Sequence, residues 1–269
     1  MDDPNAYIDI PQALGRLDQP SLTKPEQRLR SLQPETLNLQ IPETSRCLLF
    51  FDRRWMQSLI NQLVGKGFSK IQKFNKIGLT SLEHSQFGKV FVALAPWGAP
   101  AAVCRIEELR SVGLTNFIIL GIGGRLQKDH AAGSLYLIDQ AVRDEGTSLH
   151  YLKRSIFAHA SFKLSNEISR QLTDDNIEFL EGLSWTTDAP YRETLDKFLY
   201  WQKKICLTVE MELAALFSVG KYYKFDIAAL IIGADQLTVD GWIDCFDDSQ
   251  IKNTKNELNK FLCNRFISS

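Results

Sequence analysis

Two glutamates, separated by a single residue, stand in one of the most apolar parts of the chain. Glu210 and Glu212 flank Met211, and the residues at 213–217 are Leu, Ala, Ala, Leu and Phe. An unpaired charge among such side chains is costly, so the hydroxyl groups of a bound ligand would satisfy these carboxylates. Positions two apart cannot share one helical face. The alternative is a pair of acids at a helix start, where the helix dipole favours them.

A further carboxyl group follows the apolar run of residues 228–233. Asp235 comes two residues after Gly233, where a strand would end. A carboxyl group kept protonated by partial burial can give its proton to a leaving group, which is general acid catalysis. The alternative is an aspartate that only caps the loop.

Glycines are concentrated after another apolar run. Residues 121–124 read Gly-Ile-Gly-Gly and follow the apolar residues 117–120. Glycine lets the backbone come close to a ligand and leaves its N–H groups free to donate, although a tight turn without a ligand fits as well. The spacing makes no dinucleotide fingerprint, and no Lys-Ser or Lys-Thr follows to make a P-loop.

A dense polar segment spans residues 143–151. Arg143 beside Asp144 or Glu145 is more typical of a structural ion pair than of a catalytic group. Of the four histidines, His150 is the stronger functional candidate.

The apolar patterns predict the elements that position these residues. Strand, helix and strand over residues 89–121 form a parallel unit. We expect an α/β fold of three α/β/α layers around a central mixed, largely parallel sheet, with ligands at the carboxyl ends of its strands. The expected strands cover residues 47–51, 89–95, 117–121, 134–139 and 225–233, and the expected helices cover residues 55–63, 101–112 and 208–222.

The first part of the chain differs from the rest. Prolines at 4, 11, 20, 25, 34 and 42 interrupt any periodicity in residues 1–45. We therefore expect an N-terminal extension that lies across the domain or a neighbouring subunit. Residues 46–269 then form one domain, since single α/β domains of this size are common.

The charge balance and the cysteines favour a protein of the cytoplasm with a small neutral ligand. The 31 basic and 32 acidic residues give a formal net charge of -1, so no field attracts nucleic acid or an anionic membrane. The five cysteines form no CxxC pair and have no adjacent histidines, which is typical of reduced, buried thiols rather than a metal site. The acidic start is no secretory signal, and no apolar run approaches the ~18 residues of a membrane helix.

Five short stretches together resemble the nucleoside phosphorylase family, which includes purine nucleoside and uridine phosphorylases and methylthioadenosine nucleosidases. They are residues 97–102, 121–124, 141–148, 186–193 and 209–212. The resemblance runs from about Cys47 to the C-terminus and implies the fold of that family. It also implies a cytoplasmic homo-oligomer that acts in purine salvage as a pentosyltransferase, breaking the N-glycosidic bond of a nucleoside. No cofactor is implied, and phosphate is a possible co-substrate.

The resemblance assigns roles to the acidic residues. Glu212 would hold the two ribose hydroxyls, Met211 would pack on the sugar, and Glu210 would support them. Asp235 matches the catalytic aspartate of purine-cleaving members, which makes the purine a better leaving group. A purine nucleoside is therefore the favoured ligand.

Further residues would line the substrate site by the same resemblance. Gly123, Gly124 and His150 would lie near the sugar and the base. Tyr191 and Arg192 would belong to a loop over the base, where the tyrosine would stack and the arginine would reach base oxygens or phosphate.

The phosphate-binding residues of the family are not matched. Where the family has a GDPxR-like loop, residues 51–55 read Phe-Asp-Arg-Arg-Trp, so only Asp52 agrees. Ile119 and Ile122 stand at the arginine and hydroxyl positions of a second element. Burying a dianion without donors costs several kcal/mol. The residues left to form an anion site are Asp52, Arg53, Arg54 and Gly121.

Three functions stay open. The chain is a phosphorylase with a rebuilt anion site, a nucleosidase in which water replaces phosphate, or a nucleoside-binding relative without turnover. Hydrolases of the superfamily activate water with a glutamate on the first loop, and Asp52 is the only carboxylate between residues 50 and 59. A nucleoside-cleaving enzyme is the expected function, with the attacking group left open.

Overall fold

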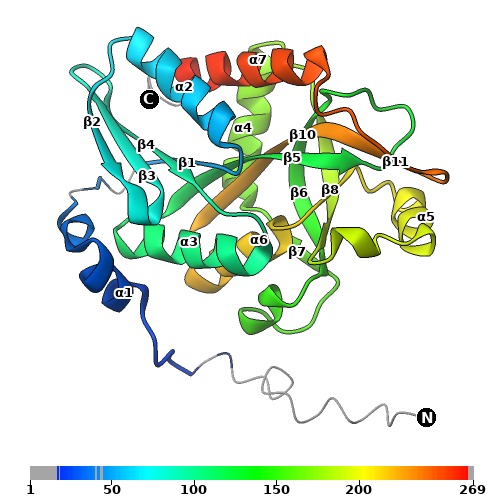
Figure 1. Ribbon diagram of the computed structural model, residues 1–269, viewed down its shortest axis with the longest axis horizontal. Coiled ribbons are helices and arrows are strands. Elements are labelled where there is room, and N and C mark those ends of the chain that lie inside the picture. The colour runs from blue at the N-terminus through cyan, green and yellow to red at the C-terminus, as the bar shows by residue number, and fades with distance from the viewer. Residues whose placement is uncertain (1–16, 18, 40, 43–44, 266–269) are drawn as a thin grey trace.

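One large mixed sheet, covered by helices on both faces, forms the centre of the molecule (Figure 1). The computed structural model describes residues 17, 19–39, 41–42 and 45–265. Residues 1–16, 18, 40 and 43–44 of the predicted N-terminal extension, residues 1–45, lie outside the described residues. The strands are β1 (Cys47–Phe50), β2 (Ser69–Phe74), β3 (Leu79–His84), β4 (Gly88–Leu94), β5 (Asn116–Arg125), β6 (Leu135–Asp144), β7 (Phe157–His159), β8 (Leu180–Thr187), β9 (Thr208–Glu210), β10 (Asp226–Thr238) and β11 (Gly241–Ile243). The helices are α1 (Pro25–Leu32), α2 (Arg53–Gly65), α3 (Ala99–Ser111), α4 (Phe162–Asp174), α5 (Leu195–Lys203), α6 (Leu213–Tyr223) and α7 (Ser249–Arg265).

Strand β5 pairs with three other strands of the sheet. It pairs in parallel with β1 on one side and with β10 on the other. Its last residues, Gly124 and Arg125, turn to pair antiparallel with Val209 and Thr208 of β9. Because β10 pairs with β6, β6 with β8 and β8 with β9, these five strands close on themselves. Strands β4, β3 and β2 extend the sheet beyond β1 through one parallel and two antiparallel pairings.

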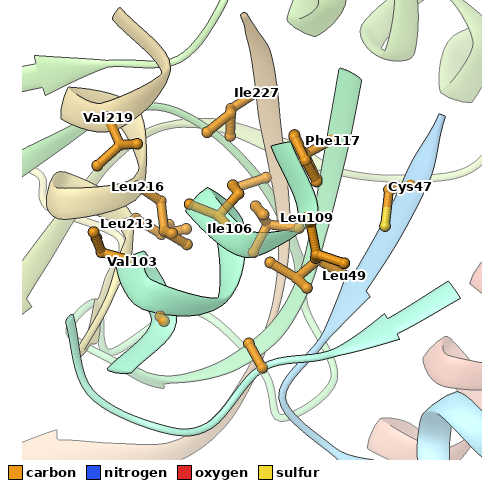
Figure 2. Packing of buried hydrophobic residues seen from close by; sticks show 14 of the residues in the cluster. Cys47, Leu49, Val103, Ile106, Leu109, Phe117, Leu213, Leu216, Val219 and Ile227 are labelled. Carbon is orange, nitrogen blue, oxygen red and sulfur yellow. The ribbon is translucent and has the colours of Figure 1, made fainter. Parts of the chain in front are cut away.

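Two apolar cores separate the sheet from its two helical layers. Helices α3 and α6 bury side chains such as Ile106 and Leu216 against one face, as Figure 2 shows. Helices α2, α4 and α7 cover the other face with side chains such as Leu59, Ile168 and Phe261. The inner strands are apolar on both faces because both faces are covered. The expected three-layer α/β/α fold with a mixed sheet is confirmed, and its antiparallel pairings are more extensive than expected.

One expected element is wrong in detail, and one alternative is excluded. Residues 208–222 are not one helix, because β-branched Thr208 and Val209 join the sheet as β9 and α6 begins only at Leu213. The alternative of a tight turn at residues 121–124 is excluded. These residues continue β5, and none of their glycines has a positive φ.

The described part of the N-terminal extension contains a helix despite its prolines. Pro25 occupies the first turn of α1, where its missing N–H is not needed. Leu29 is fully buried in the core beneath α3, and Arg28 pairs with Glu108 of α3. This part of the extension therefore packs on the domain itself. Among the described residues, none of the helices is both long and apolar enough to cross a membrane.

Candidate functional site

Glu210 anchors the start of helix α6 to the sheet. Its Oε2 accepts hydrogen bonds from the backbone N–H groups of Glu212 (2.6 Å) and Leu213 (2.7 Å), and its Oε1 accepts from the hydroxyl groups of Ser184 (3.0 Å) and Thr186. Burial raises the pKa of Glu210, while these hydrogen bonds act in the opposite direction. Both oxygens are engaged within the protein, so Glu210 has the role of a helix-start acid that shapes the site.

Glu212 lies at the same helix start but makes fewer contacts. Its Oε1 accepts from the backbone N–H of Gly98 at 2.6 Å, and the residue is 8 % exposed. Burial and, second, the nearby charge of Glu210 raise the pKa of Glu212 to about 8. The Gly98 contact joins the loop after β4 to the start of α6, and Gly98 adopts a φ of 88° that favours glycine. Met211, half-buried, lies between the two carboxyl groups in the chain.

The glycines of β5 are required by close neighbours. A Cβ on Gly123 would lie 2.2 Å from Oγ1 of Thr208, and one on Gly124 would lie 2.8 Å from Oδ2 of Asp235. A Cβ on Gly121 would lie 2.9 Å from Cδ1 of Ile231. The glycines therefore let β5 bend against β9 and β10, and they bring the Asp235 carboxylate onto the backbone of β5.

Asp235 is half-buried near the end of β10. Its Oδ2 accepts a hydrogen bond from the indole Nε1 of Trp242 at 2.7 Å. Glu193, just after the 3-10 turn Pro190–Arg192, is a second carboxyl group close by: burial and, second, the charge of Asp235 raise the pKa of Glu193 to about 7. Sequence reasoning did not single out Glu193, although it ends the 186–193 stretch. Nothing in the sequence around Trp242 indicated this contact, because it is the hairpin of β10 and β11 that brings Trp242 to Asp235.

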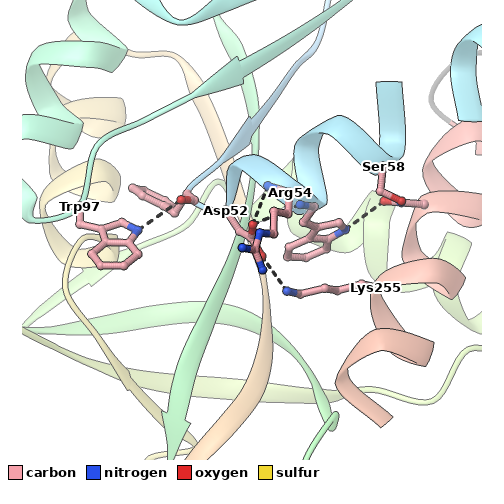
Figure 3. Close-up of polar contacts among 8 residues, drawn as sticks. Asp52, Arg54, Ser58, Trp97 and Lys255 are labelled. Atoms are coloured by element: carbon pink, nitrogen blue, oxygen red, sulfur yellow. Dashed lines mark hydrogen bonds and ion pairs between the residues drawn. The ribbon is translucent and has the colours of Figure 1, made fainter. Parts of the chain in front are cut away.

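Asp52 binds both the start of helix α2 and a lysine of helix α7. Its Oδ1 accepts from the backbone N–H groups of Arg54 (2.8 Å) and Trp55 (3.1 Å), and its Oδ2 binds Nζ of Lys255 at 2.7 Å, as Figure 3 shows. Partial burial opposes ionisation, but the hydrogen bonds from Lys255 and Trp55 outweigh it and lower the pKa of Asp52. Arg53 and Arg54 have exposed side chains on the first turn of α2.

Aromatic residues lie in and around the first loop, residues 51–55, which follows β1. The half-buried ring of Phe51 approaches Gly121, with its Cδ2 3.9 Å from a Cβ built there. The Trp97 indole donates to the carbonyl oxygen of Phe51 at 3.2 Å (Figure 3). The Trp55 indole donates at 2.9 Å to Asn259 of α7, and Ile119 is fully buried in the core.

The polar segment after β6 is mainly structural. Strand β6 runs to Asp144, so Arg143 lies in the strand, and its guanidinium binds Ser148, Leu152, Lys153 and Ser155 rather than its acidic neighbours. Asp144 accepts from Trp185 and Lys197. The expected ion pair of Arg143 with Asp144 or Glu145 is therefore replaced by bonds to the following loop.

The remaining predicted residues lie at the surface. His150 is exposed in the 3-10 turn Thr147–His150 and lines a cavity between the N-terminal extension, α3 and α6, and neither Glu212 nor Asp235 lines that cavity. Tyr191 is fully exposed and Arg192 is exposed. The structure thus joins Glu210, Glu212 and Gly98 in one group and Gly124, Asp235 and Trp242 in another, and the pairing of Gly124 in β5 with Val209 in β9 connects the two groups.

Comparisons with known proteins agree with this architecture. A family model described as the phosphorylase superfamily matches residues 58–262. Guanosine phosphorylase of Halorubrum lacusprofundi is 30% identical over 124 residues, 46% of this chain and 52% of that protein. Uridine phosphorylase of Treponema pallidum is 28% identical over 174 residues, 60% of this chain and 66% of that protein. The chain thus spans between about half and two thirds of the length of these curated relatives.

A solved structure shows the same fold. Uridine phosphorylase from Vibrio fischeri ES114 superposes with a TM-score of 0.67 at 23% sequence identity, covering 92% of this chain and 100% of that one. At this identity the likeness concerns the fold alone. The match of the family model to more than half of the chain decides membership, and the chain belongs to the phosphorylase superfamily, in the nucleoside phosphorylase family that its motifs indicate.

Proposed function

We propose that the chain binds a ribonucleoside, preferably a purine one, and releases its base with little or no dependence on phosphate. Glu212 supports the sugar-binding part. Its carboxyl group is buried, one oxygen is oriented by the Gly98 N–H, and a pair of ribose hydroxyls would supply the hydrogen bonds that burial otherwise denies it. Asp235 supports the leaving-group part as a carboxyl group at the end of a strand.

The phosphate-independent part rests on one observation: polar groups of the first loop, residues 51–55, already have partners within the protein. Asp52 binds Lys255 and the start of α2, the Trp55 indole binds Asn259, and the Phe51 ring faces Gly121. A phosphate dianion in a dry site relies on arginine and several N–H donors. An aromatic ring at this place would leave such a dianion poorly compensated.

The same observation favours a second candidate function. Hydrolysis needs a group that accepts a proton from water. Asp52, the carboxylate of the first loop, is already bound by Lys255 and the helix start, and its lowered pKa makes it a weaker base. A relative that binds a nucleoside without turnover is therefore the alternative, and cleavage assays separate the two.

The test is a nucleoside panel with a matched pair of variants. Purified protein is incubated in phosphate-free buffer with adenosine, inosine, guanosine, methylthioadenosine and uridine, and binding is followed by thermal shift and base release by chromatography. A ligand at ~100 times its Kd adds about 2.7 kcal/mol to stability. Glu212→Gln should weaken binding by up to about 10-fold, the range for a hydrogen bond between neutral groups, whereas Glu178→Gln, at an exposed loop site, should bind like the parent.

A panel in which no nucleoside raises the melting temperature would remove the binding proposal. Equal binding by Glu212→Gln and the parent would remove Glu212 from the site. Binding without base release would favour the non-catalytic relative.

A further inference from the structure

Trp97 lies on the loop after strand β4, with most of its side chain open to solvent. Its exposed fraction is 78%, so apolar packing contributes little to its position. The indole Nε1 nevertheless donates to the carbonyl oxygen of Phe51 at 3.2 Å, as the dashed line in Figure 3 shows. This hydrogen bond ties the loop after β4 to the loop after β1.

The carbonyl group that Trp97 binds belongs to a well-anchored segment. The residue before it, Phe50, accepts a hydrogen bond from the backbone N–H of Ala95 at 2.8 Å. The residue after it, Asp52, binds the start of α2 and Lys255 of α7. The Phe51 carbonyl therefore lies between two residues that are bound to other elements, and it gives Trp97 a fixed point of attachment.

The residue after Trp97 contacts the carboxyl group of Glu212. The Gly98 N–H donates to Oε1 of Glu212 at 2.6 Å. This N–H belongs to the planar peptide unit that joins Trp97 to Gly98, so its direction depends on the backbone of both residues. Gly98 has a φ of 88°, and a Cβ built on it would meet nothing within 4 Å, so glycine is favoured here by its backbone conformation and not by lack of space.

We propose that Trp97 is a positioning residue for Glu212. Its indole holds the peptide unit between Trp97 and Gly98 against the loop after β1, so that the Gly98 N–H orients the Glu212 carboxyl group for the ribose hydroxyls. The inference rests on the proposed function, in which Glu212 binds the sugar. It adds a residue that acts on this binding through Gly98.

The hydrogen bond from Gly98 also acts on the ionisation of Glu212. Burial and, second, the charge of Glu210 raise the pKa of Glu212 to about 8, while the backbone N–H groups of Gly98 and Met211 act in the opposite direction. The loop residues 96–98 carry no charged side chain, so Glu210 of β9 is the titratable group whose charge acts on Glu212. A donor stabilises the charged form of a carboxyl group, so displacing the Gly98 N–H should raise the pKa of Glu212 further.

Carboxyl NMR with isotope-labelled glutamate tests the inference without any ligand. In the parent, the resonance that Glu212→Gln removes should titrate with a midpoint near 8. Trp97→Phe keeps an aromatic ring but loses the N–H donor, and it should move that midpoint upward by about one pH unit, the lower end for a lost hydrogen bond to a charged group. An unchanged midpoint would overturn the inference, because a mere loss of stability would not move it.

Phe162→Leu is the matched control for the loss of an exposed aromatic side chain. Phe162 is 80% exposed at the start of α4, which covers the opposite face of the sheet from α6. This variant should leave the midpoint of Glu212 where the parent has it.

A second pair of variants tests the peptide unit itself. Gly98→Ala should raise the same midpoint, because alanine disfavours a φ of 88° and the N–H would turn away from Glu212. Gly88→Ala is its control: Gly88, at the start of β4, has a φ of 74°, and its Cβ would also meet nothing within 4 Å. Equal midpoints in these two variants would contradict the role of Gly98.

Nucleoside binding tests the functional part. With a nucleoside that raises the melting temperature of the parent, Trp97→Phe should weaken binding by up to about 10-fold, and Phe162→Leu should bind like the parent. Equal binding by Trp97→Phe and the parent would overturn the positioning role. Failure of every nucleoside to bind the parent, with the midpoint still moved by Trp97→Phe, would overturn the proposed function while leaving the connection from Trp97 to Glu212 in place.

Discussion

Burial dominates the ionisation of the acidic residues at this site. Burial raises the pKa of Glu212 to about 8 and that of Glu193 to about 7, in each case with a further contribution from a neighbouring carboxylate. In the unfolded chain both groups titrate near 4.3. Each group therefore holds a proton in the folded protein over a range of pH in which the unfolded chain has released it.

The first prediction is a loss of stability as the pH rises. A folded-state pKa above the unfolded value gives stability that is fully present below the unfolded pKa and is lost through the folded pKa. The contribution of these groups to the free energy of unfolding should therefore fall between about pH 4.5 and pH 8. Glu212→Gln, which cannot ionise, should flatten this slope in urea titrations at several pH values. A slope equal to that of the parent would show that Glu212 ionises normally in the fold.

At the scale of elements, the site depends on how closely β5 approaches β9 and β10. The three glycines of residues 121–124 have no side chain because hydroxyl, carbonyl, carboxylate and methyl groups of the two neighbouring strands occupy the space. This packing turns the end of β5 toward β9. The start of α6, which follows β9, and the bulge of β10 between Gly233 and Gln236 therefore lie on either side of β5.

Gly123→Ala should therefore be strongly destabilising. Its Cβ would lie 2.2 Å from Thr208 Oγ1 and 2.8 Å from the Val209 carbonyl oxygen, so β5 and β9 must separate, at a cost of about 2 kcal/mol or more. Gly65→Ala at the end of α2 is the matched control, since its Cβ would meet nothing within 4 Å, and it should stabilise by up to about 1 kcal/mol. Chemical denaturation compares the two, and similar effects would contradict the close approach of β5 and β9.

The sequence allowed the elements to be predicted better than their junctions. Apolar runs such as residues 117–120 and the helical spacing from Trp55 to Leu63 are local signals, and both predicted elements form. The predicted helix start at Thr208 was wrong because Thr208 and Val209 form β9, which pairs with β5 and β8, and these contacts are distant in sequence. The hydrogen bond from Trp242 to Asp235 was missed for the same reason, since it depends on the register of β11 with β10.

At the scale of the whole molecule, the family fold surrounds a first loop, residues 51–55, that is bound to helix α7. Phe51 follows β1 and approaches Gly121 of β5, Trp97 donates to the carbonyl oxygen of Phe51, and Lys255 of α7 pairs with Asp52. The unmatched positions were visible in the sequence as Phe51, Trp55, Ile119 and Ile122. The partners that occupy Asp52 and Trp55 come from α7, more than 200 residues away in the chain, and were not predictable from local patterns.

The most direct measurement is the initial rate of base release from a purine ribonucleoside as a function of phosphate concentration, with the sugar product identified. We expect the rate to be nearly independent of phosphate and the product to be free ribose, because the first loop offers aromatic side chains where a dianion would need charged donors. A rate that rises steeply and saturates with phosphate, with ribose 1-phosphate as the product, would contradict this expectation and assign the anion site to Arg53 or Arg54.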